Sequence, residues 1–588
     1  MLQPLLALAL LAALQGAPPV APAFDARAAE HLFNRAGFGA SGDEIQAAVA
    51  RGRDATLQLL FPAAAPQPLS DAVQNHAYGG PLSPDTPLPG GGRLQPEPEE
   101  PADGSMEGST DGSMEDTADA EREETRRREM AAARAADGRQ MAEHTNRWLA
   151  RMVQGDAALV ERMTLFWHGH FTSSMQTVRS SHALIAQHEL LRTHAVGSFR
   201  DLLAGVLRDP AMLVYLDNHR NRRGNPNENL ARELLELFTL GEGHFTEEDV
   251  KEAARALTGR AVFRGEYVFT PRRHDGGTKR ILGQEGNFDG DDLVEILLAH
   301  PRTSMHIAGR LLRWLEGVEP SPERVEHYAA LLRDADWQMA PVLRALFADP
   351  HFYGPDVVGA RVAGPVDFLV GSVRRLGVDA PPLALNLGAR VLGERLFFPP
   401  SVKGWDGGES WITTSSLLGR GNLAGMLTGS IGVMELLGAD LAAMESDEDG
   451  GMQRRGRRGP RADNAELREL VGRDQGLRDL GRLGRGRWSP QFDWKGRLAA
   501  HWSAEPANPS ADRASEPGDS DVVGFLLEEL LAIAPPPETR VELVQYLAEQ
   551  RAEFSIPDDR WLSWGQDAEQ LLTQLAHRIL ALPEAQLH

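Results

Sequence analysis

The chain has 588 residues, of which 42% are hydrophobic and 25% charged, as in an ordinary globular protein. Its formal net charge of −23 argues against general nucleic-acid binding, which requires a basic surface. Because cysteine is absent, disulfides, thiolate nucleophiles and cysteine-ligated metals are excluded, and any metal site must use histidine, carboxylate or carbonyl ligands.

The first residues have the pattern of an export signal. An apolar stretch runs from Leu5 to Leu14, and small residues and prolines follow it as far as Ala23. This pattern predicts a signal peptide over residues 1–23, with a buried N-terminal helix as the alternative because no Lys or Arg precedes the stretch. Since no segment is long enough to span a bilayer, we expect an exported protein of the periplasm or cell surface without a transmembrane anchor.

The rest of the chain alternates between helical periodicity and low-complexity sequence, which contains the pentapeptide DGSME twice. We expect a mainly α fold, a multi-helix bundle-like domain with a small β-hairpin and long disordered insertions. The expected regions are, in chain order, the N-terminal helices of the main domain (24–61), an acidic low-complexity linker (62–120), the main helical domain (121–440) with a β-hairpin near 262–282, a low-complexity insert (441–463) and a C-terminal helical region (464–588).

The densest group of polar side chains lies in NENLARELLELFTLGEG, residues 227–243. On a helix, positions 229, 232, 233 and 236 fall on one face, and leucines with Phe238 fill the opposite face. The carboxylates of Glu233 and Glu236 and the guanidinium of Arg232 are therefore neighbours within two turns. The pattern is typical of a functional stripe, or of a solvated amphipathic helix in which Arg232 and Glu236 form an ordinary salt bridge.

Two histidines separated by one glycine, His168 and His170, lie in FWHGHF. In an extended turn both imidazoles would face one side, and with a distant carboxylate they would suit Zn²⁺, Mn²⁺ or Fe²⁺. The alternative is a pair of core histidines that pack against Trp167 and Phe171. A zincin-like start at His188 is set aside, because the next histidine, at position 194, would not share its helix face.

The segment RRHDGGTK contains the third group of candidates, His274, Asp275 and Lys279. The Asp-Gly-Gly sequence is turn chemistry, which explains Asp275 without any function. His274 and Lys279 could nevertheless face a cleft together. No phosphate-binding glycine loop, dinucleotide fingerprint or nucleophile elbow accompanies these groups.

Six segments in order resemble the domain-of-unknown-function 1800 family of large bacterial proteins. They are HLFNRAGFGAS (31–41), ERMTLFWHGHFTSS (161–174), FRDLLAGVLRDPAMLVYLDN (199–218), NPNENLARELLELFTLGEGHFTEEDVKEAARALTG (225–259), HDGGTKRILGQEGNFDGDD (274–292) and LFFPPSVKGWDGGESWI (396–412). The resemblance implies an exported protein with no established catalytic residue. It favours polar residues at the motif positions as site candidates: His168, Asn227, Glu228, Arg232, Glu233, Glu236, His274, Asp275 and Lys279.

Two functions remain open at this point, beside a plain ligand-binding protein that would bind an anion through the basic loop 219–223. The resemblance implies a sulfatase-like neighbour of the domain-of-unknown-function 1501 type, for which this chain would be a non-catalytic partner or assembly factor. In that case the polar stripe would be a buried ion-pair network. The alternative is an exported, metal-assisted hydrolase in which Arg232 or Lys279 stabilises anionic charge and a glutamate acts as general base. The divalent metal would then be held by His168, His170 and a carboxylate from Glu233 or Asp275.

Overall fold

The computed structural model describes residues 23–61, 66–70, 73–76, 115–431, 490, 492–504, 516–558 and 560–588. The expected signal peptide, most of the linker predicted over 62–120 and the insert predicted over 441–463 lie outside the described residues. Within these residues the fold is mainly α with two short antiparallel hairpins, which confirms the fold class expected from the sequence. None of the described helices combines the length and the apolar composition that crossing a bilayer demands.

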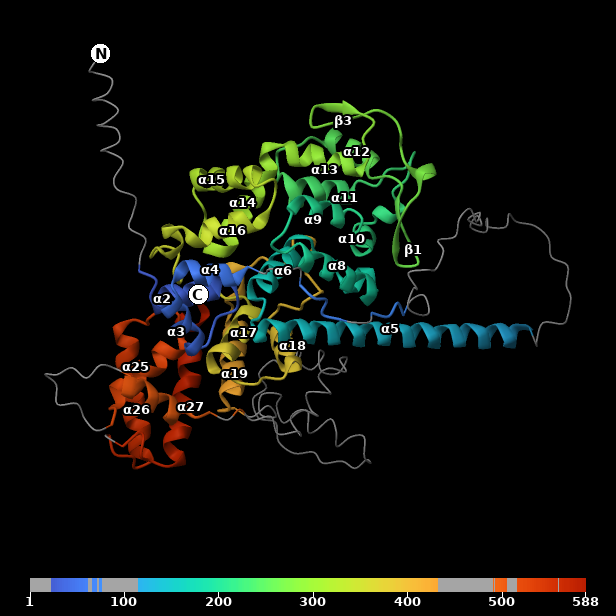
Figure 1. Ribbon diagram of the computed structural model, residues 1–588. Helices are drawn as coiled ribbons and strands as arrows, with labels where there is room; N and C mark the ends of the chain where they lie inside the picture. Colours follow the sequence, from blue (N-terminus) through green and yellow to red (C-terminus); the bar gives the residue numbers. More distant parts are fainter. Residues whose placement is uncertain are drawn as a thin grey trace, which may run out of the picture.

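One group of helices surrounds the first hydrophobic core, in the upper body of Figure 1. Capping boxes at Ser41 and Thr246 and a proline in the first turn at Pro301 fix where three of these helices begin. The group comprises α2 (Ala26–Ala36), α4 (Arg53–Leu60), α6 (Ala158–His170), α9 (Phe199–Val206), α10 (Pro210–Tyr215), α11 (Asn229–Glu233), the π-helical turn η2 (Leu234–Thr239), α12 (Glu247–Ala256), α13 (Gly290–Ala299), α14 (Pro301–Glu316), α15 (Pro322–Asp334) and α16 (Met339–Ala348), with α3 (Gly42–Arg51) packed beside α2 and α4.

Two hairpins lie at the edge of this body. Strands β1 (Arg260–Phe263) and β2 (Glu266–Phe269) pair antiparallel across Arg264-Gly265, and both turn residues have positive φ, as a tight two-residue hairpin requires. This is the hairpin that the sequence indicates. The neighbouring strands β3 (Lys279–Ile281) and β4 (Gln284–Gly286) form a second hairpin across Leu282-Gly283, which the sequence did not indicate.

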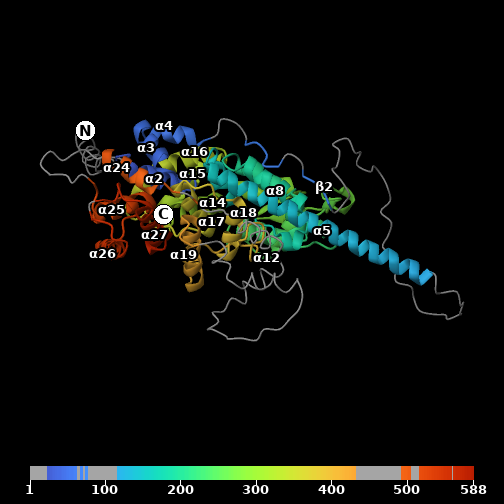
Figure 2. The same ribbon diagram turned by 90° about the horizontal axis from the view of Figure 1, so that it is seen from below.

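The long helix α5 (Glu115–Gln154) runs along the molecule, and its first half projects beyond the other helices in both views (Figures 1 and 2). Residues 124–132 are exposed. The end of the helix instead buries Trp148 and Met152. There α5 packs against α8 (Ser181–Thr193), α17 (Pro365–Leu376) and α18 (Pro382–Val391).

A second hydrophobic core joins the end of α5 to the helices in the lower part of Figure 1. Besides α17 and α18, these are α19 (Thr414–Thr428), α24 (Trp494–Ala504), α25 (Asp519–Leu530), α26 (Pro537–Glu553) and α27 (Gln566–Leu580), while α8 joins this core from above α5 in Figure 1. The helices before and after residues 441–463 therefore share one core. Part of the predicted linker also packs, because Leu69 and Val73 are apolar and contact this core.

Helix α2 and the last described residues are brought together. Residues 586–588 lie against residues 361–363, where Ala363 N donates to Gln586 O and His588 N donates to Arg361 O, at 2.8 and 2.9 Å. The buried guanidinium of Arg35 on α2 donates through Nη2 to the carbonyl oxygen of His588 at 2.8 Å. These contacts tie the start of the main domain to its end.

Candidate functional site

A cavity of about 910 Å³ opens beside α14. One wall is α14 itself, and another is the end of α6, with Phe166 and Gly169 of the FWHGHF segment. The third wall is the loop 405–411, and the floor contains Asp367 and Glu394. Two of the sequence segments that carry the family resemblance therefore meet around one hollow of the size of a small-molecule site.

Glycine and a short hydrogen bond hold the 405–411 loop against α6. Gly404 has a φ of +81°, and a Cβ atom there would lie 2.6 Å from the carbonyl oxygen of Gly169. Thr172 Oγ1 donates to Val402 O at 2.6 Å. The backbone approach at Gly404 thus sets the position of Trp405 and Trp411, which line the cavity.

The α14 wall is basic and contains an arginine without a partner. Arg302, His306 and Arg310 are four residues apart and line the cavity, as does Arg313. Arg313 forms an ion pair with Glu319 at 2.6 Å. Arg310 makes no hydrogen bond or ion pair with any described residue, and burial, followed by the charge of Arg313, lowers its pKa only to about 10. Arg310 therefore presents an uncompensated positive charge at neutral pH.

The floor of the cavity is a buried ion cluster. Asp367 accepts hydrogen bonds from Arg162 and, at 2.6 Å, from Arg361. Both guanidiniums also lie over the Trp314 ring, with their Cζ atoms 4.5 and 5.2 Å from its centroid. Although burial alone would raise the pKa of Asp367, these arginines hold it well below its usual range. Asp367 is thus an ionised structural carboxylate that bridges two guanidiniums.

Glu394, the second carboxyl of the floor, differs from Asp367 in its hydrogen bonds and in the direction of its pKa shift. Its Oε2 accepts the Val366 backbone N–H at 2.9 Å, whereas no described residue donates to Oε1. Burial raises the pKa of Glu394 to about 7, with the Asp367 charge acting in the same direction and the Val366 hydrogen bond opposing it. Two carboxyl groups of one cavity therefore have pKa values on opposite sides of their usual range, a pattern found in functional sites.

The polar stripe of residues 227–243 does not line the cavity, and most of its side chains form contacts with nearby residues. Arg232 pairs with Glu247 at 2.7 Å and with Glu228 at 3.3 Å, rather than with Glu236. The Asn227 side chain accepts the Asn229 backbone N–H at 3.0 Å, an ordinary helix-start contact.

Glu233, the remaining carboxylate of this stripe, is half-buried. Burial, followed by the nearby charge of Glu236, raises its pKa. The structure thus brings Arg232 and Glu228 together near the start of the helix and Glu233 near Glu236, on a half-exposed face.

Two histidines bind the π-helical turn that follows α11. A π-helical turn shifts the hydrogen-bond ladder and leaves carbonyls free. His170 Nε2 donates to Phe238 O at 3.1 Å, and His306 Nε2 donates to Leu237 O at 2.9 Å. The Nδ1 atom of His170 is buried without a partner. His170 therefore caps this turn through its Nε2 atom.

The structure does not bring His168 and His170 together. Both belong to the helix α6 rather than to an extended turn, and residues two apart on a helix point in widely different directions. His168 accepts the Phe397 backbone N–H at 3.2 Å and packs against Trp148 and Trp405. The predicted joint metal site at these two positions therefore lacks its geometry, because Gly169 continues the helix.

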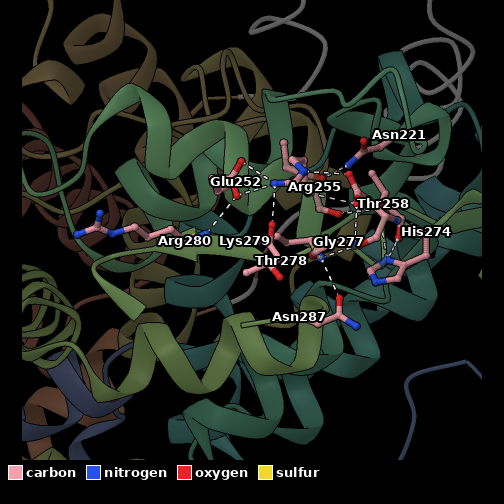
Figure 3. Close-up of polar contacts among 12 residues, drawn as sticks. Asn221, Glu252, Arg255, Thr258, His274, Gly277, Thr278, Lys279, Arg280 and Asn287 are labelled. Carbon is pink, nitrogen blue, oxygen red and sulfur yellow. Dashed lines mark hydrogen bonds and ion pairs between the residues drawn. The ribbon is translucent and has the colours of Figure 1, made fainter. Parts of the chain in front are cut away.

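The third predicted group forms a closed polar network between α12 and the hairpins (Figure 3). Lys279 is buried and donates to the carbonyl oxygens of Asp275 and Gly277, at 2.6 and 3.0 Å. Arg255 forms an ion pair with Asp275 at 2.9 Å. The His274 ring contacts Thr258 O at 3.0 Å. These hydrogen bonds give His274, Asp275 and Lys279 a structural role. None of the site residues predicted from the sequence lines the 910 Å³ cavity.

A group that could hold a metal is found between α5 and α8. Ligand atoms of His144, His188 and Glu189 all lie within 4.8 Å of one another. His144 Nε2 and His188 Nδ1 are 2.9 Å apart and share a hydrogen bond, and Ser70 Oγ contacts His144 Nδ1 at 2.9 Å. Burial lowers the pKa of His144 to about 3, so its imidazole is neutral, as a metal ligand must be.

The signals for these sites were partly present in the sequence. The His188-Glu189 pair was set aside because its partner was sought four residues later on the same helix, whereas it comes from α5. Arg310 and Glu394 were missed because their distinguishing properties are the lack of a partner and burial. The VKGWDGGESW segment was the one available signal for the cavity, through its glycines and tryptophans.

The family model described as "Protein of unknown function (DUF1800)" matches residues 31–587. No curated protein and no solved structure matches the chain. The functional hypothesis therefore depends on the geometry of the described residues.

Proposed function

We propose that this chain, which belongs to the DUF1800 family of proteins of unknown function, binds an oxygen-rich anion in the cavity beside α14. The observation that carries this proposal is Arg310, a largely buried cation that lines the cavity without a counter-charge. Burying an unpaired charge is costly, and a bound carboxylate, sulfate or phosphate group would remove that cost through charge-assisted hydrogen bonds.

Two tryptophans around the cavity favour the same ligand chemistry. The indole N–H groups of Trp405 and Trp411 have no acceptor among the described residues, so the cavity offers further donors. Asp406 and Glu409 on the same loop are exposed, and water screens their charges, whereas Arg310 acts in a less polar position. The overall charge of −23 would disfavour non-specific anion binding, so a local site is required.

Replacing Arg310 by glutamine is expected to weaken sulfate binding by about 10- to 150-fold, since a hydrogen bond to a charged group contributes about 1.5–3 kcal/mol. Isothermal titration of the purified protein with inorganic sulfate, and separately with phosphate, measures this effect. The matched control is Arg313→Gln, on the same helix and already paired with Glu319, which should change the dissociation constant by less than about threefold. Wild-type protein without sulfate or phosphate binding, or an unchanged Arg310→Gln variant, would contradict the proposal.

We further propose that the protein works outside the cytoplasm, as a non-catalytic partner or assembly factor for a sulfatase-like protein. The apolar stretch before Ala23 and the family resemblance support export. An oxyanion site is chemically compatible with a partner that acts on sulfate esters. Cell fractionation followed by Edman sequencing tests this proposal. We expect the protein in the periplasmic fraction without its first residues, and protein found in the cytoplasm with Met1 retained would contradict export.

A metal-dependent activity is the second candidate, favoured by the group of His144, His188 and Glu189. If these residues bind Zn²⁺, zinc at about 100 times its dissociation constant stabilises the fold by about 2.7 kcal/mol. Elemental analysis and the unfolding temperature with and without Zn²⁺ measure this. His144→Gln should abolish the shift, whereas the control His182→Gln, on the outer part of α8, should keep it. Metal-free protein that Zn²⁺ does not stabilise would rule out this site.

A further inference from the structure

The two oxygens of Glu394 have different surroundings. Oε2 accepts the backbone N–H of Val366, in the first turn of α17, at 2.9 Å. Oε1 has no donor among the described residues, and the side chain lines the cavity. Because an oxygen that accepts an N–H is the poorer place for a proton, a proton on this carboxyl belongs to Oε1. The neutral side chain then presents an O–H donor to the cavity.

The charged groups around Glu394 are all engaged elsewhere. Asp367, on α17, is ionised by its contacts with Arg162 and Arg361. Arg162 comes from α6, and Arg361 from the segment before α17. Arg420, on α19, donates to Gln586 Oε1 and to Ala363 O, at 2.9 and 2.7 Å. None of these arginines donates to Glu394. The charges of Arg361 and Arg420 lower its pKa, but burial and the nearby carboxylate of Asp367 raise it, and the pKa remains above its usual range.

We infer that Glu394 is a specificity-determining residue of the proposed anion site, which donates a hydrogen bond to the anion when protonated and repels the anion when ionised. The inference rests on the proposed function, and it adds that affinity for the anion is controlled by a proton. An uncharged carboxyl can contribute a donor to a site that also contains Arg310, whereas a carboxylate there would cancel the positive charge that the ligand requires.

The direction of the pH dependence follows from burial. Burial raises the pKa of Glu394 to about 7, so the group is mostly neutral in weak acid and mostly ionised in weak base. A bound anion favours the neutral form further. We therefore expect anion affinity to be constant below about pH 6 and to fall by up to about tenfold per pH unit above about pH 7.

Sulfate is the appropriate probe, because its charge does not change in this pH range, whereas phosphate titrates near neutrality. Dissociation constants for inorganic sulfate are measured between about pH 5.5 and about pH 8.5 for wild type and two variants, Glu394→Gln and Glu319→Gln. Wild type should lose affinity as the pH rises. Glu394→Gln, which is permanently neutral and has nearly the same shape, should bind equally well at all pH values. The control Glu319→Gln, at the cavity rim, should keep the wild-type profile.

The outcomes separate this inference from the proposed function. If neither wild type nor Glu394→Gln binds sulfate at any pH, the anion site itself is wrong. If both bind with the same pH profile, the anion site stands and the role of Glu394 is wrong. Infrared difference spectra give a readout without any ligand: the C=O band of a protonated carboxyl should be present in wild type near pH 6 and missing in Glu394→Gln. Its absence from wild type would also overturn the inference.

Discussion

Replacing Asp367 by asparagine is expected to lower the free energy of unfolding by about 3–5 kcal/mol. Arg162 is fully buried and Arg361 nearly so, and Asp367 is the carboxylate that both contact. Asparagine keeps the shape but removes the charge, which leaves two buried cations without compensation. Such a loss costs more than the original ion pair contributed, because neither guanidinium can regain water without opening the core.

Urea denaturation followed by tryptophan fluorescence measures this change. The matched control, Glu319→Gln, breaks the Arg313 ion pair at the surface and should cost less than about 1 kcal/mol. The folded-state pKa of Asp367 is lowered, so its stabilisation is present above the unfolded pKa near 4 and is lost as the pH falls towards the folded value. Wild type should therefore lose more stability in acid than Asp367→Asn, and equal losses would contradict this account.

Replacing Gly404 by alanine should have the second-largest effect, about 2–4 kcal/mol, concentrated on the loop 405–411. The residue has a φ of +81°, which alone costs an L-residue about 1–2 kcal/mol. The new Cβ would also lie 2.6 Å from Gly169 O, a backbone atom that moves only if α6 or the loop shifts. We expect the loop to leave α6, with weaker sulfate binding and faster proteolysis within residues 405–411.

Gly407→Ala is the matched control for this prediction. Gly407 belongs to the same loop and has a φ of +73°, but a Cβ there would meet no atom within 4 Å. It should therefore show only the backbone strain, about 1–2 kcal/mol, with sulfate affinity close to that of wild type. If both alanine variants behave alike, the contact between Gly404 and α6 does not position the loop.

Much of the fold could be predicted because local chemistry decides it. Period-3.6 apolar patterns and caps such as Ser41 mark the helices, and Arg264-Gly265 marks the first hairpin. The π-helical turn after Glu233 could not be predicted, because LLELFT contains no residue that breaks an α-helix. The conformation of FWHGHF was also misjudged, since Gly169 suggested a turn, whereas packing of Trp167 and Phe171 in the core keeps the helix.

The candidate site was harder to predict than the fold, for a physical reason. Motifs such as HDGGTK look like functional sites in the sequence because they contain several polar residues. In the structure, however, Asp275 pairs with Arg255, and Lys279 donates to carbonyl oxygens. Arg310 resembles its neighbour Arg313 in the sequence. What distinguishes it is the missing counter-charge, a property of the whole packed structure that no local pattern contains.

The contact between Arg35 and His588 has a consequence for how the protein is made. Helix α2 belongs to the first core, yet its buried guanidinium finds an acceptor 553 positions later in the chain. The same Nη2 atom also donates to Val357 O at 2.9 Å, so during synthesis both acceptors of this group are made long after α2. Chains of this kind fold late and expose apolar surface meanwhile, so a truncation that removes even residues 586–588 should yield an aggregation-prone product.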